Sequence, residues 1–286
     1  MARSFTVIQG GRRAADATMA VDPAPSGNAW QVDLHRAGTV DDEAVDAWRA
    51  LLTRNAVADP QADPDYLLSA ARHQAKGRRI AFALAWDRDA DGREALRGVL
   101  PLAMPHPVWG RGRARPWHPP GLPEPAALID GRHADAVETA IRGRLAALRR
   151  PLRLEAPPRC PVRADAPRPV LAVLPAERRA RIVPADRLVG VRPDGYAAAH
   201  AVEHVSDPMR ITAAVEAFLV LDARHAVLPI IADPSEASMV RVVTRLFARR
   251  GQMRVELARR AGEIVAATLH LGAGARAVAW RHAAGA

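Results

Sequence analysis

Apolar residues recur with two periods along the first half of the chain, and these periods predict strands and helices in turn. Strict alternation over residues 30–35 predicts a strand. Thr39 is then predicted to cap a helix in which Trp48 and its apolar neighbours share one face. A second helix is predicted from Pro64, since proline suits the first helical turn.

The pattern then changes to that of a β-hairpin. Residues 80–86 and 95–104 form two apolar runs separated by a turn rich in Asp and Gly. Residues 105–125 are rich in Pro, Gly and Arg and are predicted to be a loop. A helix over 134–148 and a short strand over 152–155 complete this half.

The second half repeats this order of elements. The predicted strands are 170–174, 201–205, 253–257, 264–271 and 276–280, and the predicted helices are 211–224 and 234–250. Each half therefore reads as a strand, two helices and antiparallel strands. The sequence predicts an α+β fold of two tandem halves, with mixed, mostly antiparallel sheets flanked by helices.

The same pattern of predicted elements and composition divides the chain into four parts. Residues 1–29 are small and polar and predict a flexible tail, and residues 157–168 form a proline-rich linker. The predicted domains are then 30–156 and 169–286.

The distribution of charge adds one feature to the predicted domains, an excess of basic residues in the middle third of the chain. The chain of 286 residues has 41 Lys and Arg against 31 Asp and Glu, a net charge of +10, and Lys76 is its one lysine. Residues 101–200 hold 17 basic and 9 acidic residues, so most of the excess lies there. An anionic partner is one explanation and a general use of Arg in place of Lys is another. Aromatic residues are only 4% of the chain, which supplies few stacking surfaces, so nucleic acid is not the expected partner.

Cysteine and hydropathy exclude several classes. Cys160 is the single cysteine, so a disulfide framework within the chain and a cysteine-based zinc site are excluded. No apolar run is long enough to predict a membrane-spanning helix. The default expectation is a cytoplasmic protein, and the pattern gives no oligomeric state.

Two groups of residues carry candidate chemistry. Arg111, Arg113 and Arg115 form the densest basic patch, which could hold a phosphate or carboxylate or could be a solvated turn. Asp222 and His225 lie three residues apart near a helix end, where a histidine beside a carboxylate can act as a base or simply cap the helix. Glu216 is a third candidate by position.

Residues 200–204 also match the zinc pattern H-x-x-E-H. That chemistry needs both histidines on one helix, but a predicted strand and Asp207-Pro208 leave little room for one. No metal site is therefore predicted, and a zinc hydrolase is the weakest reading.

Six segments resemble the Fem/BioF-like branch of the GNAT acyltransferases, which includes CelD-type polysaccharide-biosynthesis proteins. They are residues 47–52 (AWRALL), 63–67 (DPDYL), 98–102 (GVLPL), 217–223 (AFLVLDA), 262–267 (GEIVAA) and 279–280 (AW). The resemblance implies two GNAT-like halves and transfer of an acyl group from a thioester, with acetyl-CoA or another acyl-CoA as co-substrate, to an amine. It suggests a role in cell-envelope or polysaccharide metabolism and adds Trp280 as a candidate substrate contact.

The chain departs from this family at its end. Relatives continue after the strand that ends at Trp280 with a cofactor-binding loop and helix, whereas six residues follow here. We therefore expect the second half to be incomplete, and cofactor-binding residues are not assigned. The alternative is a catalytically inactive GNAT-fold binding or scaffold protein that uses its arginine patch for an anionic partner.

Overall fold

A computed structural model describes residues 29–88, 94–106, 112–120, 127–155, 183–184 and 201–285. Several predictions fall outside the described residues: most of the N-terminal tail, the tip of the first hairpin, Arg111, the linker 157–168 and the strand at 170–174. Within the described ranges the protein belongs to the α+β class, with two mixed or antiparallel sheets and helices packed on them.

The first unit is built around a sheet in the order β1-β2-β3-β4-β6, with β5 pairing β3. Asp41 and Asp63 accept backbone hydrogen bonds at the starts of its first two helices, which explains where those helices begin. Asp41 and not Thr39 therefore caps the first helix, because the Thr39 hydroxyl bonds with the backbone of Arg36. The elements are β1 (Ala29–Arg36), α1 (Asp42–Arg54), η1 (Pro60–Ala62), α2 (Pro64–His73), β2 (Arg79–Arg88), β3 (Glu94–Met104), β4 (Arg113–Pro116), β5 (Leu128–Ile129), η2 (Gly131–His133), α3 (Ala134–Ala146) and β6 (Arg153–Leu154).

The second unit has a five-stranded antiparallel sheet in the order β7-β11-β10-β9-β8. Asp207 and Asp233 cap its helices, each followed by a proline at the first helical position. The elements are β7 (Val183–Pro184), β8 (Ala201–Val205), α5 (Pro208–His225), η3 (Ile230–Ala232), α6 (Pro234–Arg249), β9 (Met253–Arg260), β10 (Glu263–Leu271), η4 (Gly274–Arg276) and β11 (Val278–Ala284).

The two units repeat the same local structure. In each, a long helix is followed by a short 3-10 turn and then by an Asp-Pro pair that starts the second helix. Asp63 follows Trp48 by the same spacing as Asp233 follows Phe218. Both second helices lead to a glycine with positive φ, Gly77 at 76° and Gly251 at 66°, a conformation that favours glycine. The repeated order predicted from the sequence is therefore confirmed.

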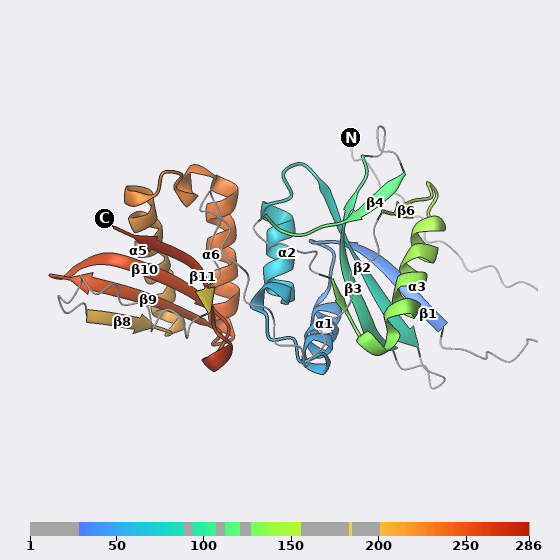
Figure 1. Ribbon diagram of the computed structural model, residues 1–286, viewed down its shortest axis with the longest axis horizontal. Helices are drawn as coiled ribbons and strands as arrows, with labels where there is room; N and C mark the ends of the chain where they lie inside the picture. Colours follow the sequence, from blue (N-terminus) through green and yellow to red (C-terminus); the bar gives the residue numbers. More distant parts are fainter. Residues whose placement is uncertain are drawn as a thin grey trace, which may run out of the picture.

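Equivalent helices join the two units. α2 packs on α6 between the two sheets, as Figure 1 shows. One hydrophobic core runs through this joint, and Tyr66 meets Trp280 edge-on there with ring centroids 5.9 Å apart. Gly272 belongs to the joint as well, because a Cβ on it would lie 3.2 Å from Pro60 of the first unit.

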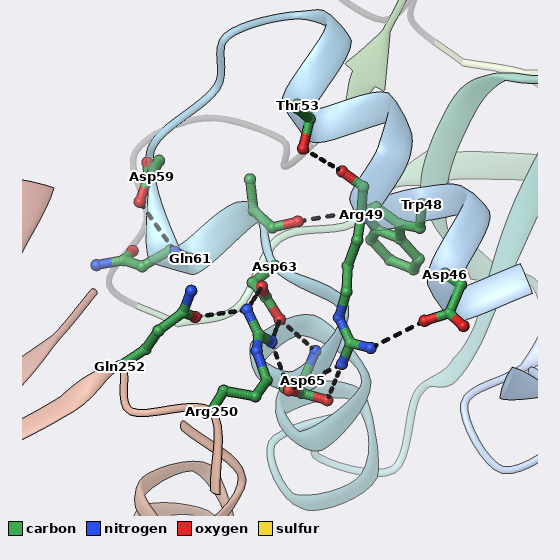
Figure 2. A network of polar contacts seen from close by, with 11 residues as sticks. Asp46, Trp48, Arg49, Thr53, Asp59, Gln61, Asp63, Asp65, Arg250 and Gln252 are labelled. Atoms are coloured by element: carbon green, nitrogen blue, oxygen red, sulfur yellow. Dashed lines mark hydrogen bonds and ion pairs between the residues drawn. The ribbon is translucent and has the colours of Figure 1, made fainter. Parts of the chain in front are cut away.

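An ionic network closes one side of the joint (Figure 2). Arg250, just beyond α6, donates to Asp63 at 2.8 and 2.9 Å and to Asp65 at 2.7 Å. Arg49 of α1 donates to the same Asp65 at 3.1 Å. Burial lowers the pKa of Arg250, but its pairing with Asp63 and Asp65 outweighs burial and raises that pKa above the ordinary value.

A second, smaller core lies on the other face of the first sheet. α3 covers this face with Val137, Ile141 and Leu145, which are fully buried. Helix α3 and strand β3 approach each other closely at Gly98, where a Cβ would lie 2.5 Å from Cγ1 of Val137. Glycine at this position therefore lets the helix sit against the strand.

We expect Gly98→Ala to destabilise the protein by about 1–3 kcal/mol, because the added methyl group overpacks a tight contact. Gly143→Ala is the matched control on α3, since a Cβ there meets nothing within 4 Å. It should be neutral or should stabilise by roughly 0.5–1 kcal/mol through helix propensity. Urea unfolding of both variants measures the difference, and equal effects would contradict the close contact.

Two parts of the predicted pattern need correction. The last strand does not end at Trp280 but runs to Ala284, because Ala266 of β10 still pairs with Ala284. The segment predicted as a loop contains β4, which is held between β3 and β6. β4 has only four residues, three of them polar or proline, so its pairing and not its hydrophobic pattern makes it a strand.

Candidate functional site

The outer faces of the two sheets differ in chemistry. In the first unit, the face that α3 covers is apolar and includes Ala83, Ala85, Leu100 and Leu102. In the second unit, the strand faces turned away from the core hold a group of polar and ionisable side chains among small apolar ones. This group consists of His204, Arg254, Glu256, Thr268, His270 and His282. Since the two units repeat one fold, this difference points to the second sheet as the candidate site.

Cross-strand register gathers these side chains around Glu256 of β9. Thr268 of β10 and His204 of β8 lie directly opposite Glu256, and His270 lies two residues beyond Thr268 on the same face, opposite Arg254. Nε2 of His270 is 3.2 Å from Oε2 of Glu256. Within the described residues neither ring nitrogen of His270 has a hydrogen bond of good geometry, so this is a close polar contact and not an aligned hydrogen bond.

Like His204 of β8, His282 of β11 is an exposed histidine of the group. Its Nδ1 lies 2.9 Å from the hydroxyl of Thr268, which fixes the ring, while the residue as a whole is exposed. Partial burial of the ring lowers the pKa of His282, and Glu256 opposes this by raising it. His282 is therefore mostly uncharged near neutral pH, in a form that can accept a proton.

His270 is buried behind this accessible edge, with 1% of its surface exposed. Burial lowers its pKa most strongly, and the positive charge of Arg254 and the proximity of His204 act in the same direction. Glu256 acts the other way and does not cancel them. His270 is thus held neutral in the folded protein.

These shifts predict acid sensitivity. A histidine whose pKa is lower when folded than when unfolded binds fewer protons in the native state, so stability falls as the pH drops below its unfolded pKa of about 6.5. The contribution is fully present above that pH. We expect His270→Gln to make the loss of unfolding free energy between pH 7 and pH 5 shallower than in the unchanged protein. Urea unfolding at several pH values tests this, and parallel curves would contradict it.

The sequence-predicted catalytic residues lie elsewhere. Glu216 pairs with Arg241 at 2.6 and 2.9 Å in a cleft of about 250 Å³ between α5 and α6, and this pairing lowers the pKa of Glu216. Asp222 is buried and accepts from the backbone N–H of Ile230 at 2.6 Å, so it anchors the turn after α5. His225 is exposed beside Gly285. Among the described residues, no hydrogen bond or ion pair joins these three candidates.

The residues predicted to bind a substrate or an anion also lie in different parts of the protein. Trp280 is buried to 2% exposure in the joint, with the Arg281 guanidinium 5.4 Å from its ring. Arg113 and Arg115 lie on β4 and share Glu155, whose pKa Arg115 lowers most. Both line a groove in the first unit.

The sequence held a signal for the site that reasoning from motifs missed. Alternate residues face the core over 253–257 of β9 and 267–271 of β10 and are apolar, which leaves Arg254, Glu256, Thr268 and His270 on the opposite face. Sorting predicted strands by face would have grouped these four residues, whereas His282 lies beyond the predicted end of its strand.

Among the residues that the structure describes, no group of three or more His, Cys, Asp or Glu could hold a metal ion. His204 lies on β8, so the strand predicted over 201–205 is confirmed. None of the helices described here has the length and apolar character needed to cross a membrane.

Fold and site together define an α+β protein made of two copies of one strand–helix–helix–meander unit, with an ionisable sheet face in the second copy. A scan of the chain against protein-family models and a search of curated proteins both found no match.

Proposed function

We propose that the protein is a GNAT-like N-acyltransferase that moves an acyl group from acyl-CoA to an amine, with His282 as the proton acceptor. The resemblance of its six sequence segments to the Fem/BioF-like branch suggests this class. The observation that carries the proposal is an accessible histidine, fixed by Thr268 and kept mostly uncharged near neutral pH.

Each residue has a separate part in the proposed reaction. An amine is protonated at neutral pH, so it loses one proton to solvent before it attacks the thioester carbonyl, and it must lose a second proton from the nitrogen as the C–N bond forms. His282 takes that proton, and Glu256 stabilises the resulting imidazolium. The new C–N bond forms, the C–S bond breaks, and the thiol leaves with the proton returned by His282. Thr268 acts as a positioning residue for the ring.

Acyl transfer by the full chain tests the proposal. Acetyl-CoA is supplied with a panel of primary amines that spans amino acids and amino sugars, and free thiol is measured. We expect thiol release that depends on the amine, and a loss of about 10²–10⁴-fold in His282→Gln, the usual contribution of general base catalysis. His118→Gln is the control, since His118 is an exposed histidine of the first unit.

Two further variants separate this reading from its competitors. Glu256→Gln removes the charge that raises the pKa of His282, so the acidic limb of the rate profile should move to lower pH. A loss in His225→Gln with none in His282→Gln would instead favour the residue predicted from the sequence. No transfer with any amine, together with no heat on titrating acetyl-CoA into concentrated protein, would overturn the proposal.

A further inference from the structure

A basic groove lies in the first unit, at the end where β2 begins and β3 ends. Its volume is about 710 Å³, within the range of small-molecule sites in proteins. Arg78 and Arg79 lead into β2 on one side, and Arg113 and Arg115 stand on β4 on the other. All four arginines are exposed, so their guanidinium groups are open to a ligand.

Positive charge in this groove is only partly neutralised. Arg113 and Arg115 share a single carboxylate, that of Glu155. For the side chains of Arg78 and Arg79, no acidic partner is found in the part of the chain that the structure describes. Guanidinium groups left without a carboxylate favour an incoming anion, which they can hold through paired N–H donors.

The repeated fold provides an internal comparison. In both units a turn that contains a glycine with positive φ, Gly77 or Gly251, joins the second helix to the next strand. The core-facing Met253 at the start of β9 corresponds to Ile80 of β2, so Gly251 and Gln252 stand where the first unit has Arg78 and Arg79. Gln252 accepts from Arg250 at the joint, and Met253 is buried. The turn therefore does not require arginine, and the pair in the first unit needs another explanation.

We propose that this groove binds a small ligand that carries two or more phosphate groups. Arginines on two sides of one groove suit a compact, multiply charged anion better than a single carboxylate. Ala103, Met104 and Pro105 at the end of β3 add an apolar part to the lining, against which the rest of a phosphate ester can pack. The limited size of the groove favours a small molecule over an extended polymer, which needs a longer basic track.

Titration calorimetry of the full chain at low salt tests this with two probes, inorganic pyrophosphate and adenosine diphosphate. We expect saturable binding of at least one probe, weakened as salt rises. Equal affinities would show that the phosphates alone are recognised, and tighter binding of the diphosphate ester would show that the apolar lining contributes. Either result supports the proposal.

Variants then locate the site. Arg78→Gln with Arg79→Gln should weaken binding by about tenfold or more for each guanidinium removed, since charged hydrogen bonds are strong. Arg260→Gln is the matched control, an exposed arginine at the end of β9, and should leave binding unchanged. Unfolding midpoints equal to those of the unchanged protein would confirm that the variants fold.

Three results would overturn the proposal: no binding of either probe at millimolar concentration, equal binding by the double variant, or duplex DNA bound more tightly than both probes with an affinity that grows with duplex length. The readout does not involve His282 or acyl transfer. The groove proposal and the acyltransferase proposal can therefore fail separately.

Discussion

Replacing Arg250 with alanine should destabilise the protein by about 3 kcal/mol, because it leaves two carboxylates at the joint without their shared partner. The side chains of Asp63 and Asp65 are 9% and 14% exposed, so water compensates little for the lost ion pairs. Arg49 still reaches Asp65, but Asp63 keeps only its role as the cap of α2. Urea unfolding gives the free energy directly.

The control for this variant is Arg241→Ala on α6. Arg241 also makes a two-pronged pair with a carboxylate, Glu216, but both side chains are more than 40% exposed. Exposed pairs contribute little, so we expect a loss below about 1 kcal/mol. If the two variants lost the same free energy, the burial of the Arg250 network would not be what makes it stabilising.

Local patterns made most of the fold predictable. Apolar spacing around Trp48 and Phe218, and the Asp-Pro pairs at 63–64 and 233–234, identify four helices in one repeated order. These signals act within a few residues, and the structure follows them. The short β4 has no such signal, because its place depends on pairing with β3 and β6.

The joint and the polar sheet face were harder to predict for a different reason. Arg250 reads in the sequence as one more basic residue at a helix end, yet its carboxylate partners lie in the other unit. Likewise Glu256 and His282 come together only through β10, which pairs with both of their strands. Contacts of this kind depend on topology, which a single sequence does not display.

Trp280 has one role predicted from the sequence and a different position in the structure. Its place in a segment that resembles acyltransferases predicts a substrate contact, while the structure packs it against Tyr66 in the joint. A substrate contact would affect activity, whereas a packing residue affects stability first. Unfolding measurements on variants of Trp280 therefore bear on its role without any knowledge of the substrate.

We expect Trp280→Ala to cost about 3–5 kcal/mol, the usual result of removing a large buried aromatic side chain. Trp280→Phe keeps an aromatic ring at the position and should cost clearly less. Because Tyr66 contacts the indole ring, Tyr66→Ala should already remove part of what Trp280→Ala removes. The double variant should then lose less than the two single variants together, by about 0.5–1.5 kcal/mol for an edge-on aromatic pair. Losses that simply add would show that the two units are not coupled through this contact, and the joint would then depend on Arg250 and the helix packing alone.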